Sequence, residues 1–210
     1  LKSLGKDDLI EKLNPSKFDD IKFHYIVQNE QKGLGHAISL AEQLIQDEPF
    51  AVLLPDDLFF SNDSCLNQLK RSYEISNASI IAVNEIELED IHKYGVIKPG
   101  NIKDNLIEIA DIIEKPEADE APSNIAVCGR YILNSSIFNK LKDVLPDKTG
   151  EIQLTDAIKL LIDDEMVLAC IYKGEKFDCG SKRGFVEATI AISLRDIEIG
   201  DEIKNVIKKI

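Results

Sequence analysis

The sequence predicts an α/β protein with a mixed, mostly parallel sheet flanked by helices. Apolar runs that suit strands alternate with segments of helical apolar spacing through residues 21–83. This alternation is typical of parallel strands joined by right-handed crossovers. Between residues 94 and 133 several strand-like runs follow one another with few helices, which predicts a small β-rich insertion. The last third of the chain returns to helical patterns.

Apolar periodicity places the individual elements. Strands are expected at residues 21–27, 51–54, 79–83, 94–97, 107–109, 112–116, 125–133 and 166–172. Helices are expected at residues 7–13, 34–45, 65–73, 135–144, 154–162, 181–194 and 203–210. Ser61 or Asn62 can cap the third of these helices, and Asn134 or Ser135 the fourth. Phe185 is expected to face inward from the helix over 181–194.

Length and composition bound the class of protein. A chain of 210 residues fits one domain with a substantial core. The net charge of −13 argues against nucleic acid and against anionic membranes as partners. No apolar run is long enough to span a bilayer, and no signal peptide is visible. The four cysteines form no CxxC pair, which suits a reducing compartment, so we expect a cytoplasmic location.

The stretch from Ala51 to Asp57 reads as a buried strand that ends at two carboxylates. In open α/β sheets the ligand crevice lies beyond the carboxyl ends of strands, and a carboxylate there can hold Mg²⁺. Pro-Asp-Asp is also good turn chemistry, and a solvated turn is the better interpretation of this segment taken alone. Asp178 follows a later predicted strand, so Asp56 and Asp178 could share one Mg²⁺.

A glycine pair, Gly33 and Gly35, lies between a predicted strand and a predicted helix. Glycine lets a flat ligand approach the backbone closely, and free N–H groups at a helix start favour acceptor atoms or phosphate. A tight turn is the default interpretation of an isolated Gly-x-Gly. The full dinucleotide fingerprint is absent, so an NAD site is not predicted.

Glu114 and Lys115 lie at the exit of a further predicted strand. A carboxylate has two oxygens with several lone pairs, so Glu114 could accept hydrogen bonds from two vicinal hydroxyls. Lys115 points to the opposite face of an extended strand, and it could reach a phosphate only if the backbone turns at Pro116. Three polar clusters at strand exits in one alternating sheet indicate a ligand cleft.

Eight motifs, in this order along the chain, together resemble the sugar-nucleotide pyrophosphorylase family, and within it the bacterial uridylyltransferases that use UTP and glucose 1-phosphate. The motifs are Gly33–Ala37, Leu54–Asp56, Tyr94–Val96, Glu114–Pro116, Ala121–Asn124, Gly129–Tyr131, Gly150–Ala157 and Asp178–Gly180. The resemblance runs from about Gln28 to near the C-terminus. It implies a Rossmann-like fold of the nucleotide-diphospho-sugar transferase type. In a single domain over 1–210, it implies a partial nucleotide-binding half at 21–92, a sugar-binding half at 93–180 and C-terminal helices at 181–210.

The resemblance also implies a reaction. A uridylyl group would pass from UTP to glucose 1-phosphate, giving UDP-glucose and pyrophosphate, with Mg²⁺ as the cofactor. The sugar phosphate would attack the α-phosphorus in line, so no side-chain nucleophile is required. The implied site residues are Gln28 and the Gly33 backbone at the uracil, Asp56 and Asp178 at the Mg²⁺, Gly95, Glu114 and Val127 around the glucose, and Lys115 and Lys182 at phosphate. Asp56, Lys115 and Asp178 form the implied catalytic set.

The sequence departs from the family in one respect. The family's first strand, its glycine-rich triphosphate loop and the following Lys-Glu segment have no counterpart in residues 1–20. We therefore expect these 210 residues to be a truncated piece that by itself has little or no activity. A thymidylyltransferase, another sugar-1-phosphate nucleotidyltransferase and a non-catalytic sugar-nucleotide-binding subunit are the alternatives. The amphipathic terminal helix predicts a homo-oligomer, either a dimer or a tetramer.

Overall fold

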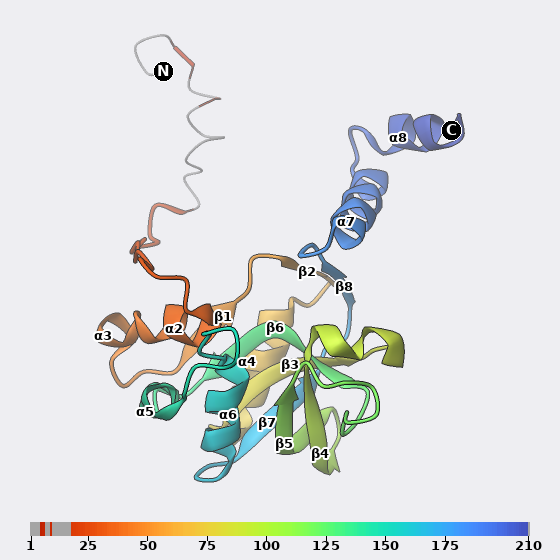
Figure 1. Cartoon of the computed structure of the whole chain (residues 1–210). Coiled ribbons are helices and arrows are strands. Elements are labelled where there is room, and N and C mark those ends of the chain that lie inside the picture. Colours follow the sequence, from red (N-terminus) through yellow and green to blue (C-terminus); the bar gives the residue numbers. More distant parts are fainter. Residues whose placement is uncertain (1–4, 7–8, 10–17, 210) are drawn as a thin grey trace. The chain divides into compact units, whose positions relative to one another are not determined.

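The computed structural model describes residues 5–6, 9 and 18–209, which divide into two compact units, Leu1–Glu30 and Gln31–Ile210 (Figure 1). The helix expected over 7–13 lies outside the described residues except at Leu9. The strand expected over 21–27 is wrong, because these residues have no regular structure and all seven are exposed. An alternating segment becomes a strand only when another strand pairs with it, and no ladder among the described residues includes this one.

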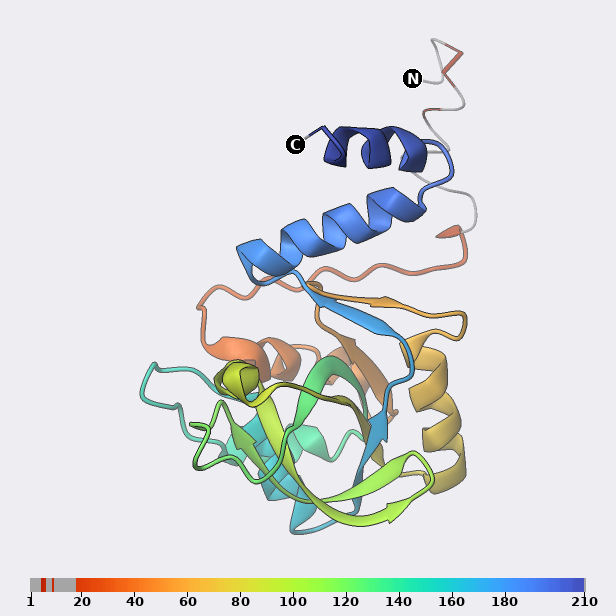
Figure 2. The same cartoon turned by 90° about the vertical axis from the view of Figure 1, so that its right-hand side faces the viewer.

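A six-stranded sheet organises the second unit. Its strands are β1 (Phe50–Leu53), β3 (Ser79–Glu85), β4 (Gly95–Lys103), β5 (Leu106–Glu114), β6 (Ile125–Leu133) and β7 (Val167–Ile171). Their order is β1-β6-β3-β7-β5-β4, and β4 also pairs with β6, so the pairings from β6 through β3, β7, β5 and β4 close into a circuit. The expected β-rich stretch therefore joins the main sheet. A separate two-stranded sheet pairs β2 (Asp57–Phe60) with β8 (Glu175–Asp178) (Figure 2).

The α/β class with a mixed sheet is confirmed, but the pairing differs from the predicted one. Among the described strands only β3 and β7 pair in parallel. Four strands nevertheless point the same way: β1, β3, β4 and β7. The first three each run antiparallel to β6, and β7 runs parallel to β3. The alternation of strands and helices therefore predicts the direction of the strands. It does not predict their neighbours, because β6, which comes later in the chain, lies between β1 and β3.

The first strand is an edge strand and not the buried strand that its apolar run predicts. Its residues alternate between half-buried and exposed, and Leu53 is 52% exposed. Among the described strands β1 pairs with β6 alone, so one side of it lacks a neighbour. The strand expected over 79–83 is buried along its length, as predicted, because β3 has neighbours on both sides.

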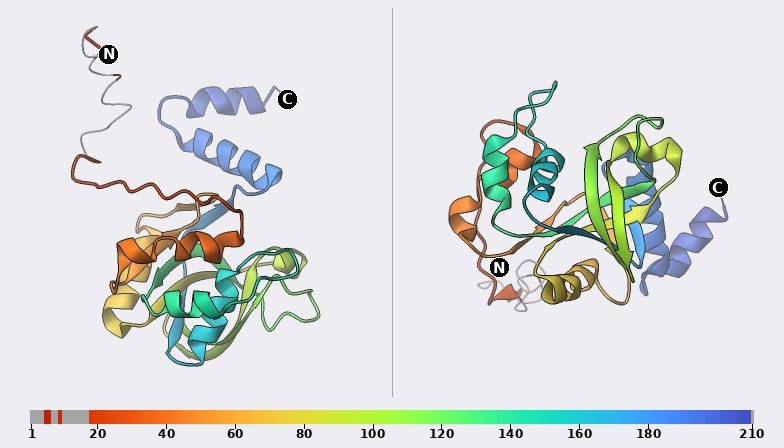
Figure 3. Two further views of the ribbon diagram at one scale, coloured as in Figure 1. Left: turned by 60° about the vertical axis from the view of Figure 1, so that its left-hand side comes forward. Right: turned by 90° about the horizontal axis from the view of Figure 1, so that it is seen from below.

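Helices cover both faces of the sheet. The second unit has helices α2 (Gly33–Ser39), α3 (Glu42–Ile45), α4 (Cys65–Ser76), α5 (Ile137–Asp143), α6 (Leu154–Ile162), α7 (Lys182–Arg195) and α8 (Gly200–Ile207), with a 3₁₀ helix η3 (Leu88–Lys93). Alternation along β3 divides the core in two: Ile81 and Val83 pack with α2, α5 and α6, whereas Ile80 and Ala82 pack with α4. Figure 3 (right) shows α4 on one side of the sheet and α5 and α6 on the other.

The expected capping residues of two helices are wrong. Ser64 caps α4 by accepting a hydrogen bond from the Asn67 N–H at 3.2 Å, in place of Ser61 or Asn62. Helix α5 begins after Ser136, whose side chain makes no capping hydrogen bond. Several Ser and Asn residues precede each helix, and any of them satisfies the composition rule for a cap.

Helix α7 turns its small side chains toward the strand that precedes it. A Cβ at Gly184 would come within 1.8 Å of the Asp178 carbonyl oxygen, and Ala188, one turn later, is buried. Phe185 is 60% exposed, which contradicts its expected inward position, because close packing on β8 selects the Gly184–Ala188 face. Within the described part of the chain, no helix has both the length and the apolar character needed to cross a bilayer.

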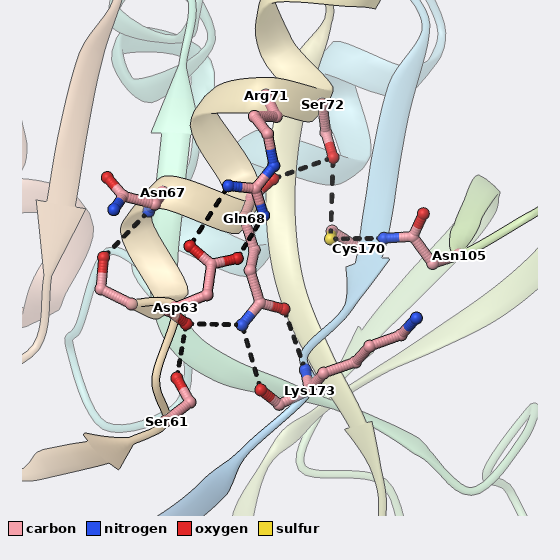
Figure 4. Close-up of polar contacts among 10 residues, drawn as sticks. Ser61, Asp63, Asn67, Gln68, Arg71, Ser72, Asn105, Cys170 and Lys173 are labelled. Carbon is pink, nitrogen blue, oxygen red and sulfur yellow. Dashed lines mark hydrogen bonds and ion pairs between the residues drawn. The ribbon is translucent and has the colours of Figure 1, made fainter.

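A buried glutamine fixes the loop that leads into β8 (Figure 4). The Gln68 amide nitrogen donates to the carbonyl oxygens of Asp63 and Lys173, at 2.9 and 3.0 Å. Its amide oxygen accepts from the Lys173 N–H at 3.0 Å. Helix α4 thereby holds the loop after β2 and the loop before β8 in one place.

Replacing Gln68 with leucine should therefore destabilise the fold. The Lys173 N–H and two carbonyl groups would lose their partner, and we expect the free energy of unfolding to fall by about 2–3 kcal/mol. Urea denaturation measures this loss. Lys70→Gln is the control, because Lys70 is exposed and its ion pair with Glu74 spans 3.7 Å, so its loss should stay below about 0.5 kcal/mol. Equal losses in the two variants would contradict the role given to Gln68.

Candidate functional site

A cleft of about 480 Å³ opens where several strands of the second unit begin or end. Its volume lies in the range of small-molecule sites. It is lined by residues from the β1–β2 turn, from β4, β5, β6 and β8, and from the start of α6: Leu54, Asp56, Asp57, Tyr94, Gly95, Glu114, Lys115, Val127, Gly129, Tyr131, Thr155, Asp178 and Gly180, among others. Strands far apart in sequence therefore deliver polar side chains to one hollow.

The carboxylates of Asp56 and Asp178 lie together in this cleft. The β2–β8 ladder sets Asp57 opposite Asp178, and the Cys179 N–H donates to the Asp56 carbonyl oxygen at 2.7 Å. A Cβ at Gly180 would come within 3.0 Å of Asp56 Oδ2 and 3.1 Å of Asp178 Oδ1. Glycine at position 180 thus leaves the space between the two carboxylates open.

Hydrogen bonds fix the orientation of the Asp178 carboxylate. The Tyr94 hydroxyl donates to Oδ2 at 2.6 Å, and the Gly180 N–H donates to Oδ1 at 2.9 Å. Burial raises the pKa of the Tyr94 phenol, and the hydrogen bond to Asp178 raises it further. The phenol therefore stays protonated at neutral pH and remains a donor to Asp178.

Asp57 lies beside this pair but has a different partner. Its side chain is 11% exposed, and its Oδ1 lies 2.8 Å from the Nζ of Lys176. Burial raises the pKa of the Asp57 carboxyl, and the charge of Lys176 opposes that rise. In the described ranges no group of three or more His, Cys, Asp or Glu side chains is arranged to hold a metal ion. Asp57 thus has an ion-pair partner, whereas the Asp178 carboxylate accepts from Tyr94 and the Gly180 N–H.

Arg130 holds the turn that carries Asp56. Its guanidinium donates to the carbonyl oxygens of Leu54 and Asp57, each at 2.7 Å, and its Cζ lies 4.5 Å from the centre of the Phe59 ring. The turn is thus tied to β6 at both of its ends. Arg130 belongs to the Gly129–Tyr131 motif, but this role could not be predicted, because an arginine that binds carbonyl groups has no distinctive spacing.

A further carboxylate, that of Glu114, also lines the cleft. The Thr155 hydroxyl donates to Glu114 Oε2 at 2.6 Å. A Cβ at Gly95 would come within 3.2 Å of both of these oxygens and 3.6 Å of Val127 Cγ2. Gly95 therefore leaves a free surface beside Glu114. Sequence reasoning missed Thr155, although the Gly150–Ala157 motif contains it.

Lys115 reaches the cleft because the backbone turns at Lys115 itself and not at Pro116. Its φ of 44° is in the left-handed region, and its N–H donates to the Tyr94 carbonyl oxygen at 3.1 Å. Glu114 and Lys115 therefore both line the cleft, and Lys115 Nζ lies 3.6 Å from Glu114 Oε1. Extended-strand geometry predicts opposite faces for the two residues, and it fails where φ changes sign.

The two glycines in the first turn of α2 serve close packing. Gly33 has a φ of 85°, and a Cβ on it would come within 2.8 Å of the Glu151 Cβ. A Cβ at Gly35 would come within 2.7 Å of the Ile152 carbonyl oxygen, which accepts from the Gly35 N–H at 2.9 Å. The neighbouring Leu34, and not Gly33, lines the cleft. The glycine pair is thus explained by contact with residues 151–152.

The remaining predicted residues lie elsewhere. Gln28 is half-buried and belongs to the first unit, whereas the residues that line the cleft belong to the second. Lys182 is exposed at the first position of α7 and does not line the cleft. The residue before it, Ser181, lines the cleft and caps α7 by accepting from the Gly184 N–H at 3.0 Å.

Comparisons with known proteins give consistent relatives. Residues 6–193 match the family described as Nucleotidyl transferase. The chain is 42% identical to the UTP–glucose-1-phosphate uridylyltransferase of Staphylococcus epidermidis, and the match covers all of this chain and 73% of the relative. It is 43% identical to the UTP–glucose-1-phosphate uridylyltransferase 2 of Staphylococcus saprophyticus, with coverages of 100% and 72%.

Two solved structures have the same fold at substantial sequence identity. One is a UDP-glucose pyrophosphorylase complexed with UDP-glucose, with a TM-score of 0.85, 40% identity and coverages of 91% of this chain and 74% of that one. The other is a UTP-bound UGPase from Acinetobacter baumannii, with a TM-score of 0.87, 33% identity and coverages of 100% and 73%.

Alanine at Gly129 should disrupt the site because two costs coincide there. Gly129 has a φ of 53°, and a Cβ on it would come within 2.2 Å of Asp57 Oδ2. We expect Gly129→Ala to lower the free energy of unfolding by roughly 3 kcal/mol or more, as the sum of backbone strain and a steric clash. Chemical denaturation measures this difference.

Gly150→Ala is the matched control. Gly150 also has a positive φ, 86°, but a Cβ there would meet nothing within 4 Å. The Gly150→Ala variant should lose only about 1–2 kcal/mol of the free energy of unfolding, from backbone strain alone. If both variants lose the same stability, Gly129 is needed only for its backbone conformation and not for the approach of Asp57.

Proposed function

The chain belongs to the nucleotidyl transferase family, and on that premise we propose that it transfers a uridylyl group from UTP to glucose 1-phosphate, giving UDP-glucose and pyrophosphate. Both curated relatives described above carry the name of this activity. One observation supports placing this reaction in the cleft. Tyr94 donates to Asp178 and the next residue, Gly95, lies against Glu114, so two consecutive residues join a two-carboxylate end to a hydroxyl-binding end.

Asp56 and Asp178 are the residues proposed to hold Mg²⁺. They fit this ion because Mg²⁺ usually takes one or two carboxylates and completes its shell with waters and substrate phosphates. The absence of a third ligating side chain among the described residues agrees with this partial shell. A bound Mg²⁺ would neutralise phosphate charge during the transfer. The task of the chain is to orient the two carboxylates, through Tyr94 and the Gly180 N–H at Asp178.

Glu114 is proposed to bind the hydroxyls of the glucose. Thr155 occupies one side of its Oε2, which leaves lone pairs on both oxygens for hydroxyl donors. The sugar ring would lie against Gly95, where a side chain would collide with Glu114 and Thr155, with Val127 alongside. This arrangement supports recognition of a polyhydroxylated ring at a fixed distance from the carboxylate pair.

Lys115 is proposed to contact phosphate from the same edge of the cleft. Its side chain is 57% exposed, and its ammonium lies beside Glu114 and not in a buried ion pair, so it is able to turn to a ligand. Lys182 is proposed as a second phosphate contact. With no nucleophilic side chain required, the acceleration would come from positioning and charge neutralisation as the sugar phosphate attacks the α-phosphorus in line.

The base site and the biological context remain proposals from the resemblance. Gln28 and the Gly33 backbone are proposed to read the uracil edge. A cytoplasmic location is proposed because all four cysteines are free thiols. A dimer or tetramer is proposed because exposed apolar residues cluster around α8, among them Ile197, Val206 and Ile207.

Binding of UDP-glucose tests the proposal directly, and it does not require that these 210 residues turn over rapidly. Isothermal titration calorimetry with UDP-glucose, in excess MgCl₂ and in EDTA, should show that Mg²⁺ tightens binding at least about tenfold. Asp56→Asn and Asp178→Asn should each remove this gain and leave the metal-free affinity in place. No binding of UDP-glucose by the unaltered chain would refute the proposed function.

Two controls complete this experiment. Asp163→Asn removes an exposed carboxylate outside the cleft and should keep the full Mg²⁺ gain. Titration with dTDP-glucose distinguishes the thymidylyl alternative, since a uridylyltransferase should bind UDP-glucose more tightly. If dTDP-glucose binds more tightly, the nucleotide assignment is wrong, whereas the metal assignment is not affected.

A further inference from the structure

A buried ion pair lies next to the two converging carboxylates and has no part in the reaction proposed above. Lys176 Nζ lies 2.8 Å from Asp57 Oδ1, with side-chain exposures of 12% and 11%. Lys176 is two residues before Asp178, and Asp57 directly follows Asp56. We propose that Lys176 is a positioning residue for the metal site, which holds Asp57 away from the space between Asp56 and Asp178 and supports Tyr94 against Asp178. The inference rests on the proposed function.

Stability alone is a poor explanation for this pair. Removing two charges from water is costly, and their mutual attraction often fails to compensate, so apolar replacements of similar volume are frequently no less stable. A buried pair at this position therefore calls for another reason. Asp57 is adjacent in sequence to Asp56, and Lys176 is two residues before Asp178, so both members of the pair lie beside proposed metal ligands.

The first contact of Lys176 directs the Asp57 side chain. Asp57 lines the cleft together with Asp56 and Asp178, so three carboxylates come close together in an acidic chain. Lys176 forms an ion pair with Asp57 Oδ1. Asp57 Oδ2 lies against Gly129, where a Cβ would come within 2.2 Å of it. Both Asp57 oxygens are thus turned toward Lys176 and Gly129. Consistently, Asp57 does not join the other two in a group of three metal-ligating side chains among the described residues.

The second contact supports the donor to Asp178. Lys176 Nζ lies 4.7 Å from the centre of the Tyr94 ring, at a distance typical of a cation–π contact. The Tyr94 hydroxyl in turn donates to Asp178 Oδ2 at 2.6 Å. Lys176 therefore contacts the neighbours of both proposed ligands, and it makes no ion pair within 4 Å of Asp56 or Asp178 itself. Its charge lowers the local negative potential without occupying the position of the cation.

A double variant separates positioning from stability. Lys176→Met with Asp57→Asn removes both charges and leaves no unpaired buried charge, so its melting temperature should stay close to that of the unaltered chain. Its apparent dissociation constant for Mg²⁺, measured by calorimetry in the presence of UDP-glucose, should nevertheless rise at least about tenfold, as for other residues that orient metal ligands. Lys176→Arg keeps the positive charge and should stay within about threefold of the unaltered chain.

Tyr94→Phe gives a second, independent variant in case the double variant does not fold. It keeps the ring beneath Lys176 and removes only the hydroxyl that donates to Asp178, so it should also weaken Mg²⁺ binding about tenfold. A folded double variant that binds Mg²⁺ as tightly as the unaltered chain would overturn the inference. If the double variant does not fold, an unchanged Mg²⁺ affinity of Tyr94→Phe would overturn it. The failure of the unaltered chain to bind UDP-glucose is a different result, and it refutes the proposed function itself.

Discussion

The short ladder between β2 and β8 is the constraint on which the site depends. Each strand has four residues, and a two-stranded sheet of this size is marginal by itself. It nevertheless sets Asp57 opposite Asp178 and so brings Asp56 and Asp178 together across more than a hundred residues of chain. Three side chains support it: Arg130 ties its start to β6, Gln68 ties the loop before β8 to α4, and Lys176 joins the two strands directly.

Two consecutive residues, Tyr94 and Gly95, connect the aspartates of the cleft to Glu114. Tyr94 donates its hydroxyl to Asp178 and accepts the Lys115 N–H at its carbonyl oxygen. Gly95 follows and lies directly opposite Glu114 in the β4–β5 ladder. The Tyr94 hydroxyl thus fixes this link at Asp178, and the β4–β5 ladder fixes it at Glu114. Rigid placement of this kind suits a reaction that depends on alignment of two phosphate groups.

Periodicity and strand exits predicted much of this protein, since both depend on local sequence. The strand over 79–83, the helix over 154–162 and the polar residues Asp56, Glu114 and Asp178 after predicted strands were found from such patterns. What was missed depends on distant partners. The insertion of β6 beside β1, the carbonyl contacts of Arg130 and the hydrogen bond from Thr155 to Glu114 require residues that only the folded chain brings together.

Asp56 and Asp178 are proposed to share one divalent cation beside the sugar nucleotide. The most direct measurement is an anomalous-difference map from crystals of this chain grown with UDP-glucose and Mn²⁺, which replaces Mg²⁺ and scatters anomalously. One strong peak is expected between the two carboxylates and in contact with the nucleotide phosphates. A peak bound to neither aspartate, with UDP-glucose present in the map, would contradict it.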